Sequence, residues 1–118
     1  MTNGALPIRV GVLYDIPHPD DLFERALRIG IDEVAATGRL DRDFEFIACQ
    51  ARGLPWGSEH DVTVGFEELA AQGVLAIVGP SISDNGLIVA PLCDRAELPA
   101  INYTGGERTR SQWMFHYQ

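Results

Sequence analysis

The segment that most constrains the fold is a short apolar run that ends in a glycine, a proline and two serines, Leu75-Ala-Ile-Val-Gly-Pro-Ser-Ile-Ser83. Its apolar residues are typical of a strand buried on both faces, and Gly79-Pro80 predicts a turn before a helix that begins near Ser83. Such a junction leaves backbone N–H groups free at the helix N-terminus, where the helix dipole favours an anion. Ser81 and Ser83 add hydroxyl groups for a ligand or a cap. The run therefore predicts a place that holds a small molecule.

The rest of the chain alternates between strand-like and helix-like segments. The predicted strands lie near 8–14, 44–49, 75–78, 98–103 and 112–117, and the predicted helices near 20–37, 59–72 and 84–97. This alternation is typical of an α/β fold in which a mostly parallel sheet is covered by helices on both faces, in three αβα layers. Ligands bind such sheets beyond the carboxyl ends of the strands. That rule selects four loops, at 15–19, 52–58, 79–83 and 103–107.

Local signals refine this prediction. Ser58 is expected to cap the second helix, with Asp61 as its capping-box partner. Ser83 is expected to cap the third helix, and Pro91 is expected to kink or split that helix. Asp15 has the chemistry to bind an ammonium group, but an exposed acid that precedes a helix is the preferred interpretation.

Composition excludes several classes of function. Nine arginines stand against seventeen acidic residues, and the net charge of -8 argues against nucleic acid, whose phosphates require basic patches. The chain contains no lysine, which excludes a P-loop, a Schiff base and a phospho-receiver site. Cys49 and Cys93 are expected to be free thiols, with a disulfide as the alternative, and with three scattered histidines they form no metal motif. No cofactor, no catalytic residue and no enzyme activity is predicted, because no nucleophile–base pair and no carboxylate pair stands out.

Several pieces of the sequence together resemble a known family. In chain order they are Ile8-Arg-Val-Gly-Val-Leu13, Gly30-Ile-Asp-Glu-Val34, Glu68-Leu-Ala-Ala-Gln-Gly-Val-Leu-Ala-Ile-Val-Gly-Pro80, Ser83, Ala90-Pro91, Leu98-Pro-Ala-Ile-Asn-Tyr-Thr104 and Trp113-Met-Phe115. At these spacings the chain resembles the type I periplasmic solute-binding proteins, in particular the branched-chain amino acid and amide binding proteins of bacterial ABC uptake systems. The resemblance implies a flavodoxin-like strand order, 2-1-3-4-5, and the first part of lobe one of a two-lobed protein. An incomplete lobe would expose apolar sheet surface, so we expect poor monomeric behaviour.

The resemblance also implies a binding site. In such proteins the serine of Gly-Pro-x-x-Ser and the loop after the fourth strand bind the carboxylate and the ammonium group of the ligand. The ligand-binding residues predicted here are Ser83, Ser81, Thr104, Gly105 and Gly106, with Tyr103, Tyr14 and Trp56 as apolar or stacking walls. Two loops depart from the family pattern: 15–19 lacks the usual small, glycine-containing turn, and 50–58 lacks the usual acid.

The implied function is ligand binding by lobe closure in an ABC uptake system, for a branched-chain amino acid, an amide or a similar small polar solute. The implied partners are that ligand, an ABC permease and the remainder of the two-lobed protein. The implied location is periplasmic or otherwise extracytoplasmic, although residues 1–9 show no apolar run of the signal-peptide kind. A cytoplasmic ligand-sensing regulator on the same fold is the alternative. A stand-alone flavodoxin-like or receiver domain is a second alternative, which the missing lysine and the poor phosphate loop after the first strand disfavour.

Overall fold

The computed structural model describes residues 6–17, 21–102 and 107–116 of the chain. Five parallel strands form one sheet in the order β2-β1-β3-β4-β5, which confirms the predicted α/β fold and strand order. The strands are β1 (Ile8–Tyr14), β2 (Phe44–Gln50), β3 (Ala76–Val78), β4 (Ala100–Asn102) and β5 (Met114–His116). The helices are α1 (Leu22–Ala35), α2 (Glu59–Ala71) and α3 (Ser83–Ala96), with a short 3-10 turn, η1, at Glu107–Thr109.

The strands differ in length. β1 and β2 pair along their whole length, from Ile8 opposite Phe44 to Tyr14 opposite Gln50. The other three strands have only three residues each, fewer than the sequence predicts. At β4 the reason is local, because Pro99 has no N–H to donate and the strand begins only at Ala100.

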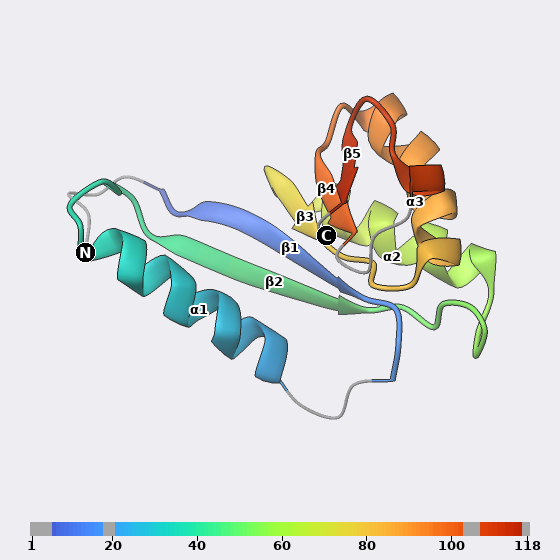
Figure 1. Ribbon diagram of the computed structural model, residues 1–118, viewed down its shortest axis with the longest axis horizontal. Helices are drawn as coiled ribbons and strands as arrows, with labels where there is room; N and C mark the ends of the chain where they lie inside the picture. Colours follow the sequence, from blue (N-terminus) through green and yellow to red (C-terminus); the bar gives the residue numbers. More distant parts are fainter. Residues whose placement is uncertain (1–5, 18–20, 103–106, 117–118) are drawn as a thin grey trace.

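One face of the sheet carries the hydrophobic core. Helices α2 and α3 lie together on this face, beside the short strands (Figure 1). Leu13, Leu69 and Ile77 are almost completely buried between the sheet and α2, and Val89 and Met114 continue the core beneath α3. This is the close packing expected of a covered parallel sheet.

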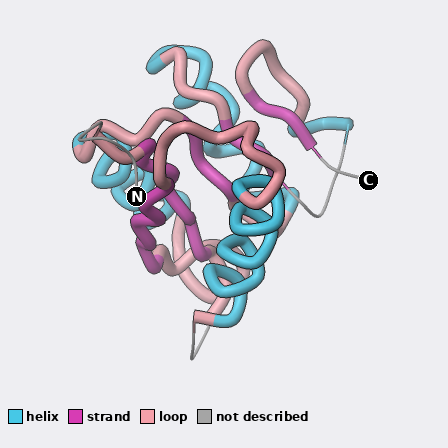
Figure 2. The backbone as a smooth tube through the Cα atoms, turned by 90° about the vertical axis from the view of Figure 1, so that its left-hand side faces the viewer, coloured by secondary structure: helices cyan, strands magenta, loops and turns pink. Residues whose placement is uncertain are grey.

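The other face is covered only in part. Helix α1 runs alongside β1 and β2, away from α2 and α3 (Figure 1), and the view turned by 90° shows helices on either side of the strands (Figure 2). The apolar stripe of α1 faces the sheet, yet none of the helix residues is buried. An apolar cavity of about 460 Å³ separates them, lined by Val10, Ala26, Leu27, Gly30, Ile31, Val34, Phe44, Phe46 and Val78. The expectation that helices cover both faces therefore holds for the α2–α3 face and only in part for the α1 face.

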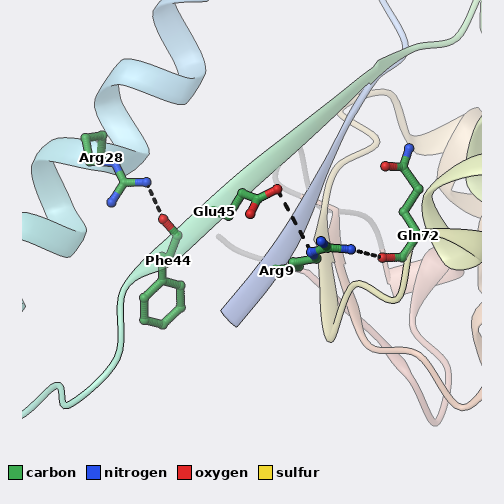
Figure 3. Close-up of polar contacts among 5 residues, drawn as sticks. All are labelled: Arg9, Arg28, Phe44, Glu45 and Gln72. Atoms are coloured by element: carbon green, nitrogen blue, oxygen red, sulfur yellow. Dashed lines mark hydrogen bonds and ion pairs between the residues drawn. The ribbon is translucent and has the colours of Figure 1, made fainter. Parts of the chain in front are cut away.

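Polar contacts hold the ends of this arrangement together (Figure 3). On α1, the guanidinium of Arg28 donates to the carbonyl of Phe44 and lies 5.0 Å from the centre of the Phe46 ring. On β1, Arg9 donates to the carbonyl of Gln72 at the end of α2, at 3.0 Å, and its Nε lies 3.9 Å from a carboxylate oxygen of Glu45. Arginines thus tie both α1 and α2 to the two long strands.

Helix α3 corrects two predictions. The helix runs unbroken through Pro91, so the expected split is wrong. The N-cap position is held by Ile82, and Ser83 is already the first helical residue, so Ser83 does not cap α3. At α2, in contrast, the Ser58 hydroxyl accepts from the backbone N–H of Asp61 at 3.1 Å, which confirms the predicted cap. Within the described residues, none of these helices has the length and apolar character of a membrane span.

Candidate ligand-binding site at the carboxyl ends of the strands

A buried carboxylate organises the carboxyl end of the sheet. Asp15 follows directly after β1 and is only 1% exposed. Its Oδ1 accepts from the N–H and the hydroxyl of Ser81, at 2.8 and 2.7 Å, and its Oδ2 accepts from the N–H of Ile82 at 2.9 Å and from the Asn85 amide at 2.8 Å. Four donors fill the acceptor positions of one carboxylate, and hydrogen bonds to a charged group are the strong ones. We call Asp15, Ser81, Ile82 and Asn85 the Asp15 clasp.

The Asp15 clasp changes the interpretation of the predicted anion site. The N–H groups at the start of α3 do attract a negative charge, as expected from the helix dipole. That charge belongs to the protein, because Asp15 binds the N–H groups of Ser81 and Ile82. The preferred interpretation of Asp15 as an exposed acid is therefore wrong. The physical reason is that a buried carboxylate is tolerated when this many donors surround it.

Asn85 extends the clasp to a second loop. Its side-chain oxygen accepts from the N–H of Leu54 at 2.8 Å, and its amide donates to the carbonyl of Leu54 at 3.1 Å. At β4, the side-chain amide of Asn102 donates to the carbonyl of Ile82 at 3.3 Å. The clasp thereby joins the segments that follow β1, β2 and β3 and connects them to the end of β4.

Gly79 allows the strands to meet at this point. Its φ of 109° lies in the region that side chains disfavour, and a Cβ atom there would lie 2.3 Å from the carbonyl oxygen of Leu13. Glycine is therefore required for the turn that brings Ser81 to Asp15. The segment 75–83 therefore forms the turn at Gly79-Pro80 that the sequence predicts.

A pocket of about 380 Å³ opens next to the clasp. It is lined by Asp15, Pro17, Gln50, Ala51, Arg52, Gly53 and Trp56. The Trp56 side chain is 56% exposed, and Arg52 is exposed as well. The guanidinium of Arg52 has no hydrogen bond or ion pair with the residues that the structure describes, whereas the Gln50 side chain donates to the carbonyl of Ile16 at 2.8 Å. Among the described residues, the pocket therefore offers the flat aromatic ring of Trp56 and the guanidinium of Arg52, which has no partner there.

The predicted site residues fall into different places. Trp56 lines the pocket, whereas Ser81 does not line it and donates its hydroxyl to Asp15. Ser83 is partly buried in the first turn of α3 and does not line the pocket. Tyr14 lies under α1, where its hydroxyl donates to Glu24 at 3.0 Å and its ring meets the edge of Phe23. The other predicted site residues lie outside the described residues and remain predictions: Tyr103, Thr104, Gly105 and Gly106.

Sequence analysis missed Asn85 and Arg52. Asn85 carries a recognisable signal, because it is a polar residue at a position of α3 that shares a buried face with Val89 and Cys93. Arg52 carries no comparable signal, since an arginine in a loop is most often a surface residue.

The two cysteines are free thiols of low reactivity. Burial raises the pKa of Cys93 to about 12, with a smaller contribution from Asp94. Burial, followed by a hydrogen bond and the charge of Glu68, raises the pKa of Cys49 to about 11. Both thiols are thus protonated at neutral pH, and neither offers a nucleophile there. The described residues contain no group of three or more side chains suited to hold a metal ion.

Solved structures show where this fold occurs. An ABC transporter substrate-binding protein from Desulfitobacterium hafniense, in complex with Leu, has a TM-score of 0.75 and 18% identity, over 94% of this chain and 34% of that chain. A branched-chain amino acid transporter substrate-binding protein from Streptococcus pneumoniae, in complex with isoleucine, has a TM-score of 0.71 and 19% identity, over 94% and 33%. A solute-binding protein of an ABC transporter from Rhodopseudomonas palustris, in complex with 3,4-dihydroxy benzoic acid, has a TM-score of 0.65 and 19% identity, over 93% and 31%.

At these identities the likeness establishes the fold. The chain has the fold of part of a type I periplasmic-binding-protein lobe, as the sequence resemblance predicted, and it spans about one third of the length of these proteins. No protein-family model and no curated protein matches the sequence.

Proposed function

We propose that this chain is a ligand-binding module for a small polar solute, such as a branched-chain amino acid or an amide. The observation that carries the proposal is the pocket beside the Asp15 clasp, at the carboxyl ends of β1 and β2. This is where ligands bind in sheets of this kind. The likeness to substrate-binding proteins, two of which contain Leu or isoleucine, supports the same class of function.

The chemistry of the pocket favours binding over catalysis. The carboxylate at its floor, Asp15, already accepts four hydrogen bonds and has no free acceptor position for a proton transfer. The thiols of Cys49 and Cys93 are protonated at neutral pH. The described part of the pocket wall thus has neither a carboxylate with a free acceptor position nor a thiolate, which suits a receptor.

The larger setting of the module is part of the proposal. We infer that the chain forms part of a two-lobed solute receptor that closes around its ligand and delivers it to an ABC permease on the outer side of the membrane. The support is that the chain covers only about one third of each similar substrate-binding protein, so most of a receptor of that size lies in other segments.

Backbone NMR tests the binding function directly. ¹⁵N-labelled chain is titrated with leucine, isoleucine, leucinamide and small carboxylates at up to millimolar concentration. We expect saturable shifts of the amides in 50–58 and around Asp15 and Ser81, whereas amides of α1 remain unchanged. A panel that produces no saturable shift in these loops would refute the proposal, as would shifts confined to α1.

A matched pair of variants adds a control. Trp56→Ala should weaken the shifts, since it removes the exposed ring at the pocket. Leu75→Ala should leave them unchanged, because Leu75 is a large exposed apolar residue that lies against Arg9 and Gln72 at the opposite ends of the strands. Equal losses in both variants would point to non-specific binding.

A further inference from the structure

We propose that Arg52 and Trp56 form the specificity subsite of this pocket, and that the subsite selects a monocarboxylate whose apolar part packs on the indole ring. Arg52 pairs with the carboxylate, and the ligand needs no ammonium group. The inference rests on the proposed binding function and names the class of ligand for it.

The first argument is that the neighbouring anion site is already filled. The N–H groups of Ser81 and Ile82, immediately before the first residue of α3, both donate to Asp15. A ligand carboxylate that displaced Asp15 would leave this side chain buried without its donors, at a large cost in free energy. The carboxylate of the ligand must therefore find another donor.

The second argument concerns the ammonium group of an amino acid. Asp15 is the only acidic side chain that lines the pocket, among the residues the structure describes. Its two oxygens each accept two hydrogen bonds, so no acceptor position remains for an ammonium group. Asp15 therefore does not distinguish an amino acid from the same acid without its amino group.

The third argument is that Arg52 is an available and well-placed donor. Among the described residues that line the pocket, Arg52 is the only one with a basic side chain, and it is exposed and has no partner among those residues. Its backbone is held on both sides, because Ala51 donates to the carbonyl of Tyr14 at 2.8 Å and Ser58 donates to the carbonyl of Arg52 at 2.9 Å. A guanidinium on a fixed backbone can make two parallel hydrogen bonds to one carboxylate.

The fourth argument is the position of Trp56. The turn that carries it is fixed, since Gly57 donates to the carbonyl of Gly53 at 2.8 Å and Leu54 is bound on both sides by Asn85. Gly53 lies so close to Asn85 that a Cβ atom would stand 2.5 Å from its amide nitrogen. The indole is nevertheless 56% exposed at the pocket. An exposed aromatic ring on a fixed turn offers an apolar surface to a ligand at a low cost in backbone entropy.

Fluorescence of Trp56 tests the proposal. The chain has two tryptophans, so Trp113→Phe leaves Trp56 as the single reporter. This variant is titrated with leucine, 4-methylpentanoate (leucine without its ammonium group), leucinamide (leucine without its carboxylate) and benzoate. We expect saturable changes with the three carboxylates, similar affinities for leucine and 4-methylpentanoate, and at least tenfold weaker binding of leucinamide. Leucinamide that binds as well as leucine, or 4-methylpentanoate that binds tenfold more weakly, would overturn the proposal.

Charge variants locate the carboxylate. Arg52→Gln should weaken the binding of carboxylates about 10- to 100-fold, the range for loss of a charged hydrogen-bond pair, and Arg52→Lys should restore part of it. Arg39→Gln is the matched control, because Arg39 is exposed in the turn between α1 and β2. A ligand that still binds Arg52→Gln with unchanged affinity would refute the subsite and leave the binding function standing. An unmodified chain that shows no saturable NMR shift with any of the ligands would instead refute the binding function.

Discussion

The two faces of the sheet carry similar apolar patterns but reach very different degrees of burial. On the α2–α3 face, Leu69 and Val89 are fully buried. On the α1 face, the helix with the most strongly amphipathic pattern of the three has no buried residue, and Ile101 and Phe115 are 44% and 53% exposed. A pattern of apolar residues thus indicates which side of a helix faces the sheet. It does not indicate how closely the two surfaces approach.

The difference in burial between the two faces follows from the number of helices that cover each face. The core face has two helices in contact with each other and with strands from both halves of the sheet. The α1 face has one helix beside β1 and β2, and an apolar cavity of about 460 Å³ lies between helix and sheet. Ile101 and Phe115 on that face keep part of their contact with water and therefore contribute less to stability.

The largest expected difference between the two faces is in the free energy of unfolding after a leucine-to-alanine substitution on each. Leu69→Ala on α2 should lower the free energy of unfolding by about 2–5 kcal/mol, since it removes a fully buried side chain. Leu27→Ala on α1 should cost about 1 kcal/mol, because Leu27 lines the open cavity. Urea denaturation followed by circular dichroism measures both, and equal losses would show that α1 packs as closely as α2.

The second largest effect on the free energy of unfolding is expected at the Asp15 clasp, at the carboxyl ends of the strands. Asp15→Asn should lower the free energy of unfolding by about 2–3 kcal/mol, because an amide cannot accept from all four donors of the clasp and charged hydrogen bonds are the strong ones. Asp84→Asn, at an exposed position in the first turn of α3, is the control and should cost less than about 1 kcal/mol. A clasp variant as stable as this control would mean that the loops are held by packing alone.

The alkylation rate of Cys49 reports on the local environment of one side chain on the α2–α3 face, and the expected effect is smaller than the two above. Glu68 lies 3.4 Å from the Cys49 sulfur and contributes to its raised pKa of about 11. Glu68→Gln removes the charge and lowers this pKa, so at pH 8 the thiolate fraction and the alkylation rate should increase several-fold. Iodoacetamide labelling followed by mass spectrometry measures the rate, with Cys93 as the internal control, since it is fully buried. An unchanged rate at Cys49 would show that burial alone controls this thiol.

The smallest effect on stability is expected on the open face. Ile101→Thr and Phe115→Thr should each change the free energy of unfolding by about 0.5 kcal/mol or less, because both side chains are largely exposed. The same changes should reduce self-association of the chain, which we expect from exposed apolar surface. Light scattering measures association and urea denaturation measures stability. A large loss of stability would show that this face is covered in solution.

The parts of the fold that sequence predicts well are those set by local pattern. The order of strands and helices, the cap at Ser58 and the turn at Gly79 each follow from a few neighbouring residues. The strand order also required the resemblance to a known family, because periodicity does not specify which strands are adjacent.

The parts that sequence did not predict depend on distant residues. Asp15 is read as exposed from its neighbours alone, and only the approach of α3, more than sixty residues later, buries it among four donors. Ser83 does not cap α3, because the extended residue before the helix is Ile82 and Ser83 already lies within the first turn. Long-range hydrogen bonds of this kind leave no periodic signal in the sequence.

The hydrogen bonds of Asp15 join residues that are separated by 66 to 70 positions along the chain. We expect such distant pairings to form late in folding, because the entropy of the intervening loop must first be overcome. A partly assembled chain that lacks them would lack the pocket as well. If the chain binds the solute proposed above, only the fully folded chain can bind it, and the bound solute in turn stabilises that chain against unfolding.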